Sequence, residues 1–162
     1  MDRDFTEIYR EYRDMVYNYM YWKTGSSEEA LDLTQEVFLK IYKNLRKFRG
    51  ESSLKTWIMK IATNHANSFF SRSKFRKLLS FNKSIEYLQD TKNENNGLKL
   101  EVENALLKLR KKEREIIVLY YMEGFSYKEI STLLGIPIGT VKSRLNRAKE
   151  NLKKILGDDY GK

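Results

Sequence analysis

The sequence contains no cysteine, one proline and one histidine among its 162 residues. Without cysteine there can be no disulfide framework and no thiolate metal site. A single histidine, His65, excludes multi-histidine metal centres and most histidine-paired nucleophiles. No apolar run approaches the roughly 18 residues that a bilayer-spanning helix needs, and Met1 to Asp4 lack the apolar core of a signal peptide. We therefore expect a cytoplasmic protein with no membrane insertion, no metal and no cofactor.

Basic and apolar residues are abundant instead. Lysine and arginine number 31 against 22 acidic residues, so the formal net charge is +9. This balance favours a polyanionic partner, either a nucleic acid or an anionic membrane surface, although many basic proteins bind neither. Apolar residues make up 41% of the chain, which is enough for one ordinary domain or two small ones.

The apolar residues of the first half recur at the three- and four-residue spacing of amphipathic helices. This spacing predicts helices over residues 5–22, from Ser26 to about Phe48, and from Ser53 to about Phe70. Ser26 and Glu29 have the spacing of a capping box at the start of the second helix. We expect the buried stripe of this helix to contain Ala30, Val37, Phe38, Ile41, Tyr42 and Leu45, and its outer face to carry Asp32, Gln35 and Glu36.

The second half is also helical in pattern, and a polar stretch separates it from the first. Residues 93–97 are Asn-Glu-Asn-Asn-Gly, without any period. Short helices are predicted near residues 100–109, 116–120 and 126–134, and a last helix follows Pro137. Since strand-type alternation is scarce, the expected fold is all-α, with a first domain at 1–78, a flexible linker at 79–99 and a second domain at 100–162.

A helix-turn-helix motif is the sharpest pattern in the second half. A capping box at Ser126 and Glu129 opens the first helix, and Gly135 stands where the chain must reverse. Small Ser131 allows a close helix crossing, and Val141 packs the second helix against the first. The second helix fits a DNA major groove, where arginine grips guanine and asparagine grips adenine, while its N-terminus and lysines suit phosphates. Its candidate DNA-binding residues are Thr140, Lys142, Ser143, Arg144, Asn146 and Arg147.

Two other interpretations apply to this segment. A solvated basic helix in an ordinary helical hairpin would show a similar charge pattern. A phosphate-binding loop is suggested by the glycines at 135 and 139, but no lysine directly follows Gly139 and no strand precedes the loop. We reject the phosphate loop and retain the helix-turn-helix.

Several segments resemble the extracytoplasmic-function class of sigma factors. Phe-Ser-Tyr-Lys-Glu-Ile at 125–130, followed by Ile-Pro-Ile-Gly-Thr-Val-Lys-Ser-Arg at 136–144, resembles region 4.2 of that class. Asp-Leu-Thr-Gln-Glu-Val-Phe at 32–38 resembles region 2.2, and the segments at 48–50, 56–58 and 61–64 resemble regions 2.3 and 2.4. The two motif sets occur in the family's order and span nearly the whole chain.

The resemblance implies a role for each of these surfaces. Asp32, Gln35 and Glu36 would face the β′ clamp helices of core RNA polymerase, and the second domain would meet the β flap while its last helix reads the −35 element. The −10 element would be opened and held by Phe48, Arg49, Ser52, Ser53, Trp57, Lys60, Asn64 and Arg72. Unstacked bases suit aromatic and amide groups, and lysines suit a single strand. Trp57 has core packing as its alternative role.

The resemblance further implies that the chain lends promoter recognition to polymerase in a stress or envelope response. An anti-sigma partner, in some cases membrane-bound, is the other implied partner besides polymerase and promoter DNA. A homodimeric helix-turn-helix regulator is the competing interpretation, but it gives the first domain's motifs no use. An enzyme is the third class, and no carboxylate pair, nucleophile–base pair or nucleotide loop occurs in the sequence to support one.

Overall fold

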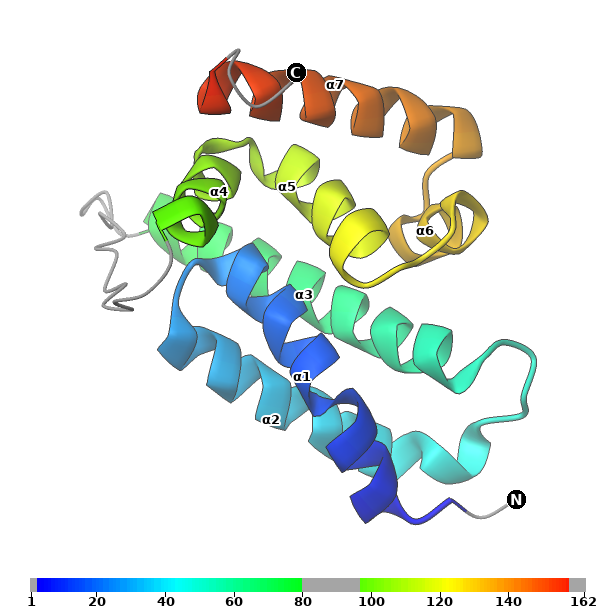
Figure 1. Cartoon of the computed structure of the whole chain (residues 1–162). Helices are drawn as coiled ribbons and strands as arrows, with labels where there is room; N and C mark the ends of the chain where they lie inside the picture. Colours follow the sequence, from blue (N-terminus) through cyan, green and yellow to red (C-terminus); the bar gives the residue numbers. More distant parts are fainter. Residues whose placement is uncertain (1–2, 80–96, 158–162) are drawn as a thin grey trace. The chain divides into compact units, whose positions relative to one another are not determined.

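The computed structural model describes residues 3–79 and 97–157, and every regular element in these ranges is helical (Figure 1). The chain divides into two compact units, Met1–Leu88 and Gln89–Lys162. The prediction of an all-α fold with two small helical domains is confirmed. Residues 80–96, which include most of the expected linker, lie outside the described residues, so the linker stays a prediction.

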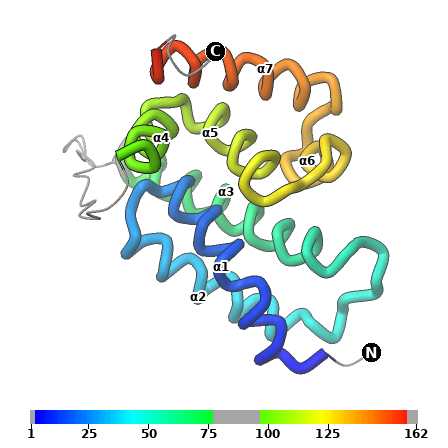
Figure 2. The backbone as a smooth tube through the Cα atoms, in the orientation of Figure 1, coloured from blue at the N-terminus to red at the C-terminus, as the bar shows by residue number. Residues whose placement is uncertain are grey.

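The first unit is built from three helices, α1 (Phe5–Thr24), α2 (Ser27–Asn44) and α3 (Leu54–Leu79). Helix α1 packs along α2, and both contact α3 (Figure 2). Their amphipathic stripes meet in one core because each helix has an apolar side that needs cover. The largest fully buried side chains of this unit are Tyr19, Ile8, Met20, Ile41, Ile58 and Met59.

The joint between α1 and α2 differs in detail from the predicted capping box. Gly25 ends α1 with φ 71°, and Ser26 Oγ accepts a hydrogen bond from Glu29 N at 3.3 Å, as expected of a cap. The backbone N–H of Ser26, however, donates to Thr24 Oγ1 at 3.1 Å. The buried Thr24 hydroxyl thus takes the place predicted for the Glu29 carboxylate, because it is already fixed beside that N–H by the end of α1.

The predicted ends of the second and third helices are wrong, and so is the predicted burial of Tyr42. Helix α2 ends at Asn44 and continues as a 3₁₀ turn, Leu45–Lys47, while α3 runs on to Leu79 beyond the predicted end near Phe70. The basic extension of α3 contains arginine, lysine and leucine, which have high helix propensity, so the helix continues beyond its packed part. Tyr42 was expected in the buried stripe but is 64% exposed. It follows buried Ile41 by about 100° around the helix, and its ring meets Phe5 edge-on at the surface.

The second unit consists of α4 (Gly97–Lys108), α5 (Lys111–Ile117), α6 (Tyr127–Leu134) and α7 (Ile138–Leu156), with a π-helical turn, Val118–Met122, after α5. Helix α7 packs against α4, α5 and α6. Fully or nearly fully buried in this unit are Ile116, Leu119, Phe125, Ile130, Leu133, Val141, Leu145 and Ala148. Its core therefore braces the whole inner side of α7.

Charged and amide groups also link the helices of the second unit. Glu113 of α5 is buried, and its Oε1 accepts a hydrogen bond from Asn151 Nδ2 of α7 at 2.9 Å. Arg114, also buried, donates from Nη1 to the carbonyl oxygen of Leu107 in α4 at 3.2 Å. Because buried polar groups are costly unless paired, these bonds select one arrangement of the helices.

Candidate nucleic-acid interface

The helix-turn-helix is formed by α6, a short turn and α7. The predicted capping box is present, since Ser126 Oγ accepts from Glu129 N and Glu129 Oε2 accepts from Ser126 N. Gly135 ends α6 at φ 65°, a left-handed conformation that favours glycine. Across the turn, Ser131 Oγ donates to the carbonyl oxygen of Ile136 at 2.5 Å. The small serine predicted at this crossing therefore also stabilises the turn through a hydrogen bond.

The outer side of α7 presents polar and basic groups, as the sequence predicted. Val141, Leu145 and Ala148 face the core, whereas Lys142, Ser143, Asn146 and Arg147 are exposed. Thr140 and Arg144 are half-buried at the edge of this side. Ser143 Oγ is bonded to the Thr140 carbonyl at 3.2 Å, within the first turns of the helix. The six candidate residues thus share one accessible surface.

Lys142 of this surface lies against a pair of tyrosine rings, Tyr127 and Tyr120. The Lys142 ammonium lies 5.8 Å from the centroid of the Tyr127 ring, within cation–π range. The Tyr127 ring stacks on Tyr120 with centroids 5.0 Å apart. The pKa of the Tyr120 hydroxyl is raised, chiefly by its hydrogen bond with Tyr127, and the positive charge of Lys149 offsets only part of this rise. Tyr120 is half-buried beside α7 and Tyr121 is 54% exposed, so neither is an ordinary core residue.

The candidate −10 residues lie on the loop before α3 and along that helix. The Phe48 and Trp57 rings contact each other with centroids 5.2 Å apart, and both are half-buried. Ser53 caps α3, because its Oγ accepts from Thr56 N at 3.1 Å. Arg49 and Ser52 project into solvent from the loop. An aromatic pair next to a helix cap and exposed polar groups can shape a pocket for an unstacked base.

Further along α3, accessible polar groups lie on the same helix face as Trp57. Lys60 is half-buried and Asn64 is exposed, three and seven residues after Trp57, so the three share a helix face. Arg72 is exposed and its Nε donates to the Ser68 carbonyl at 3.3 Å. The structure thus brings the loop and the first half of α3 together as one surface and leaves Arg72 further along the helix.

The outer side of α2 carries the third candidate set. Asp32, Gln35 and Glu36 are all exposed, as predicted. Beside them, however, stand large exposed apolar groups: Leu31 and Leu39, to which the sequence assigned no role, and Tyr42, which was expected to be buried; they are 53%, 60% and 64% exposed. Leu31 and Leu39 lie four residues before and four residues after Gln35, and Tyr42 lies three residues after Leu39, so they form one stripe along α2. The helical spacing of these residues could have indicated an exposed apolar stripe, but the same spacing is equally typical of a buried helix face.

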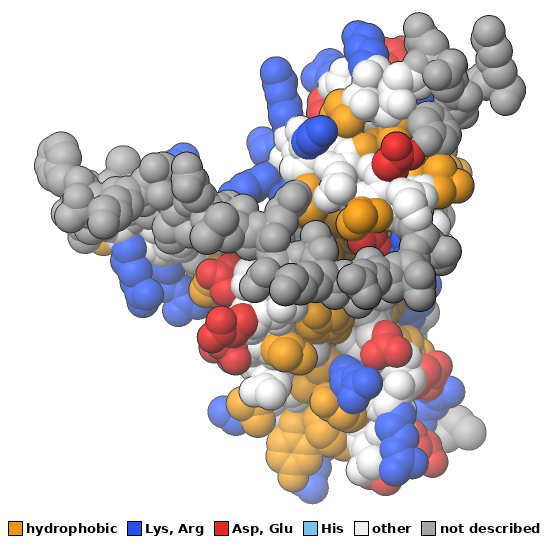
Figure 3. Space-filling view, turned by 60° about the vertical axis from the view of Figure 1, so that its left-hand side comes forward, with side chains coloured by type: hydrophobic (Ala, Val, Ile, Leu, Met, Phe, Trp, Pro, Cys, Tyr) orange, Lys and Arg blue, Asp and Glu red, His pale blue; other side chains and the backbone are white. Residues whose placement is uncertain are grey.

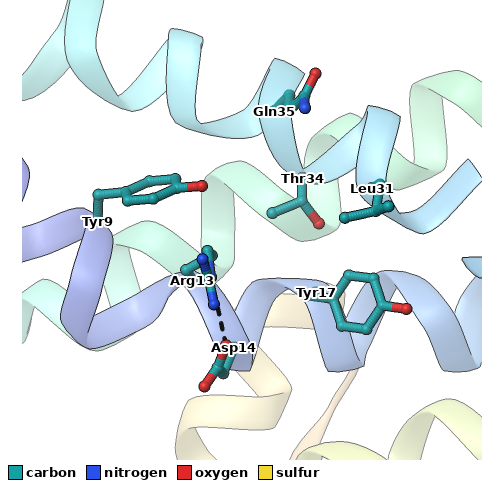
Figure 4. Close-up of a pocket in the computed structure, with 7 residues that line it drawn as sticks. All are labelled: Tyr9, Arg13, Asp14, Tyr17, Leu31, Thr34 and Gln35. Atoms are coloured by element: carbon teal, nitrogen blue, oxygen red, sulfur yellow. Dashed lines mark ion pairs between the residues drawn. The ribbon is translucent and has the colours of Figure 1, made fainter. Parts of the chain in front are cut away.

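A pocket adjoins this stripe between α1 and α2 (Figure 4). Its volume is about 340 Å³. The stripe residues Leu31 and Gln35 line it from α2, and the Arg13–Asp14 pair on α1, with Arg13 Nε 3.5 Å from Asp14 Oδ1, forms a charged rim. The full set of lining residues is Tyr9, Arg13, Asp14, Tyr17, Leu31, Thr34 and Gln35.

Comparison with known families matches both units. Residues 8–76 match the model of Sigma-70 region 2, and residues 99–152 match that of Sigma-70, region 4. The ECF RNA polymerase sigma factor SigW of Bacillus subtilis is 34% identical over 171 residues, covering 97% of this chain and 91% of the relative. The chain belongs to the ECF class of the sigma-70 family. The ECF RNA polymerase sigma-E factor of Escherichia coli is 33% identical to this sigma factor over 140 residues, covering 76% and 72% of the two chains.

Solved structures agree with this membership. The sigma factor RpoE, in complex with the anti-sigma factor NepR from Bartonella quintana, matches with a TM-score of 0.77 at 26% identity, over 98% of this chain and 99% of that one. CnrH, in complex with the cytosolic domain of CnrY, has the same fold, with a TM-score of 0.68 at 20% identity. As an ECF sigma factor, the chain directs transcription initiation by RNA polymerase.

The candidate residues fall inside the matched regions of the sigma factor. Those on α2, on the following loop and on α3 lie within 8–76, and those on α7 lie within 99–152. Over the described ranges, no helix is long and apolar enough to cross a bilayer. Nor do those ranges gather three or more potential metal-ligating side chains in one place.

Proposed function

We propose that this sigma factor holds core polymerase through the outer side of α2, opens the −10 element with the loop before α3 and with α3 itself, and reads the −35 element with α7. The observation that carries this division is the exposure of three polar surfaces on two units that match region 2 and region 4. The second unit's contact with the β flap belongs to the same proposal.

The surface on α2 suits a protein partner. Exposed apolar side chains that form a stripe beside charged groups are typical of interaction sites. Figure 3 shows hydrophobic side chains reaching the surface of the first unit among charged groups. We propose that Asp32, Gln35 and Glu36 bind the polymerase β′ clamp helices, and that Leu31 and Leu39 add buried apolar contact between them.

The loop and α3 suit single-stranded DNA. Phe48 and Trp57 supply aromatic faces on which a base can stack, and Asn64 supplies an amide that can bond a base edge. Arg49, Lys60 and Arg72 supply positive charge for phosphates. Ser52 and Ser53 complete the loop, with Ser53 fixing its end on the helix.

The outer side of α7 suits the major groove of a duplex. Arg144 and Arg147 are one turn apart, and around the helix Arg147 lies between Asn146 and Arg144, so the side chains with base-reading chemistry follow one another on the outer side of α7. Thr140, Lys142 and Ser143 lie near the N-terminus of α7, where the helix dipole favours phosphate.

We further propose a cytoplasmic location and regulation by an anti-sigma protein that covers these surfaces, since RpoE of Bartonella quintana is bound to NepR. We also propose that the chain acts by binding and catalyses no reaction itself, because its relatives are named as sigma factors of RNA polymerase. The response that releases the protein stays the stress or envelope response predicted from the resemblance.

Run-off transcription with purified core polymerase and a promoter library tests the proposal. The wild-type chain should give discrete transcripts that core enzyme alone does not give. The double variant Gln35→Ala with Glu36→Ala should weaken polymerase association and leave the helical fold intact, because both side chains are exposed. Glu7→Ala, which removes an exposed carboxylate from α1, is the matched control. Normal capture of β′ by the double variant would remove the assignment of α2.

A further inference from the structure

His65 links α3 to the proposed polymerase-binding side of α2 through one hydrogen bond. Its ring is buried in α3, with 6% of the side chain exposed, yet Nε2 lies 2.6 Å from Oε2 of Glu36 on α2. The Glu36 side chain is 56% exposed. A buried group on one helix therefore contacts an accessible carboxylate on another, a contact that nothing in the sequence indicated.

The surroundings of the ring decide which way this bond runs. The other ring nitrogen, Nδ1, is buried and has no hydrogen-bond partner among the residues that the structure describes. A hydrogen on Nδ1 would be a buried donor without an acceptor, which is costly, whereas a bare nitrogen loses less. The favoured tautomer therefore carries its hydrogen on Nε2 and donates it to Glu36.

We propose that His65 is a positioning residue for polymerase binding: it fixes the Glu36 carboxylate in the orientation in which a basic or N–H group of the polymerase meets it. This inference rests on the proposed function of α2. Oε2 is occupied by His65, so Oε1 and the remaining lone pairs stay available to the partner.

The physical gain comes from order that exists before binding. A free glutamate on a helix surface samples several rotamers and loses that freedom when a partner binds it. Glu36 held by His65 has already lost most of it. Ordering one such side chain at an interface weakens binding by about 3- to 10-fold, which is the effect expected when the His65 donor is removed.

Equilibrium binding of the full-length chain to core polymerase tests this role. His65→Leu keeps an apolar side chain of similar size but removes the donor, and should weaken binding about 3- to 10-fold. His65→Gln offers an amide N–H near the position of Nε2 and should restore most of the affinity. In a Glu36→Ala background, His65→Leu should cause little further loss, because the group it positions is already gone.

Met59→Ala controls for loss of stability. Met59 is fully buried in the same helix, so this variant lowers the thermal midpoint of the first unit without removing a donor to Glu36. Two results would overturn the positioning role. One is an equal loss of affinity on adding His65→Leu to the wild type and to Glu36→Ala. The other is an equal loss of affinity in Met59→Ala and His65→Leu when the two variants are equally stable. If Glu36→Ala binds normally while Gln35→Ala does not, the inference fails but the α2 assignment stands. If neither affects binding, both fail.

A nitrogen-detected NMR spectrum tests the bond without polymerase. The chain has one histidine, so its two ring nitrogens give a single, unambiguous pair of signals. We expect protonated Nε2 and bare Nδ1 in the wild type, and an altered Nε2 shift in Glu36→Ala. A ring that averages between both tautomers in the wild type would contradict the hydrogen bond.

Discussion

Arg147 and Arg144 show how far single residues of α7 can be assigned. Arg147 is exposed, so its guanidinium can reach a base edge, whereas Arg144 is half-buried. A good bidentate contact between arginine and guanine contributes about 1–3 kcal/mol of discrimination. The two residues therefore differ in what their removal should do to the fold.

Arg147→Ala should reduce −35-dependent transcription about 10-fold while leaving polymerase binding unchanged, because it removes a base contact and no core contact. The measurement is run-off transcription at fixed salt, with core binding measured in parallel. Lys153→Ala removes the same charge from an exposed site further along α7 and should have a small effect. Loss of core binding by Arg147→Ala would show that the residue faces polymerase and not DNA.

At the scale of elements, the two glycines on either side of the turn between α6 and α7 differ in backbone conformation. Gly135 has φ 65°, and Gly139, in the first turn of α7, does not have a left-handed backbone. An added Cβ meets no heavy atom within 4 Å at either site. Any difference between alanine variants at the two positions therefore reports backbone conformation and not a steric clash.

Gly135→Ala should destabilise the second unit by about 1 kcal/mol, since alanine is strained in the left-handed region. Gly139→Ala should stabilise it by about 0.5–1 kcal/mol, because alanine is the better helix former. Far-ultraviolet circular dichroism during denaturation measures both. Trp22 and Trp57 lie in the first unit, so the tryptophan fluorescence transition should not move. Equal effects of the two variants would contradict the conformational argument.

At the scale of the whole molecule, the net charge of +9 and the separate units predict weak DNA binding by the chain alone. In a gel-shift assay without polymerase, we expect only salt-sensitive, sequence-tolerant binding, with a Kd on the order of 10⁻⁴–10⁻⁶ M at physiological salt. Core polymerase should convert this into tight, promoter-specific binding. Specific binding of a short duplex by the free chain as a homodimer would favour an ordinary helix-turn-helix regulator.

Much of the site could be predicted because its elements are local. The capping box of Ser126 and Glu129 and the glycine turn at Gly135 are written in a few adjacent residues, and the structure confirms both. The exposed side of α7 follows from the helical period alone. By contrast, Tyr42 was wrongly placed in the core, because a period of about 3.6 residues says which side chains share a face and not where the covering helix stops.

The sequence by itself determined the helical class, the two-part organisation, the helix-turn-helix and the family, because all of these depend on local propensity, period and short motifs. Only the tertiary structure decided which groups meet across helices. Glu113 meets Asn151 and Glu36 meets His65 over separations of 38 and 29 residues. No local pattern encodes such distances, since packing of the apolar faces sets how neighbouring helices lie, and that arrangement decides which polar atoms come within bonding range.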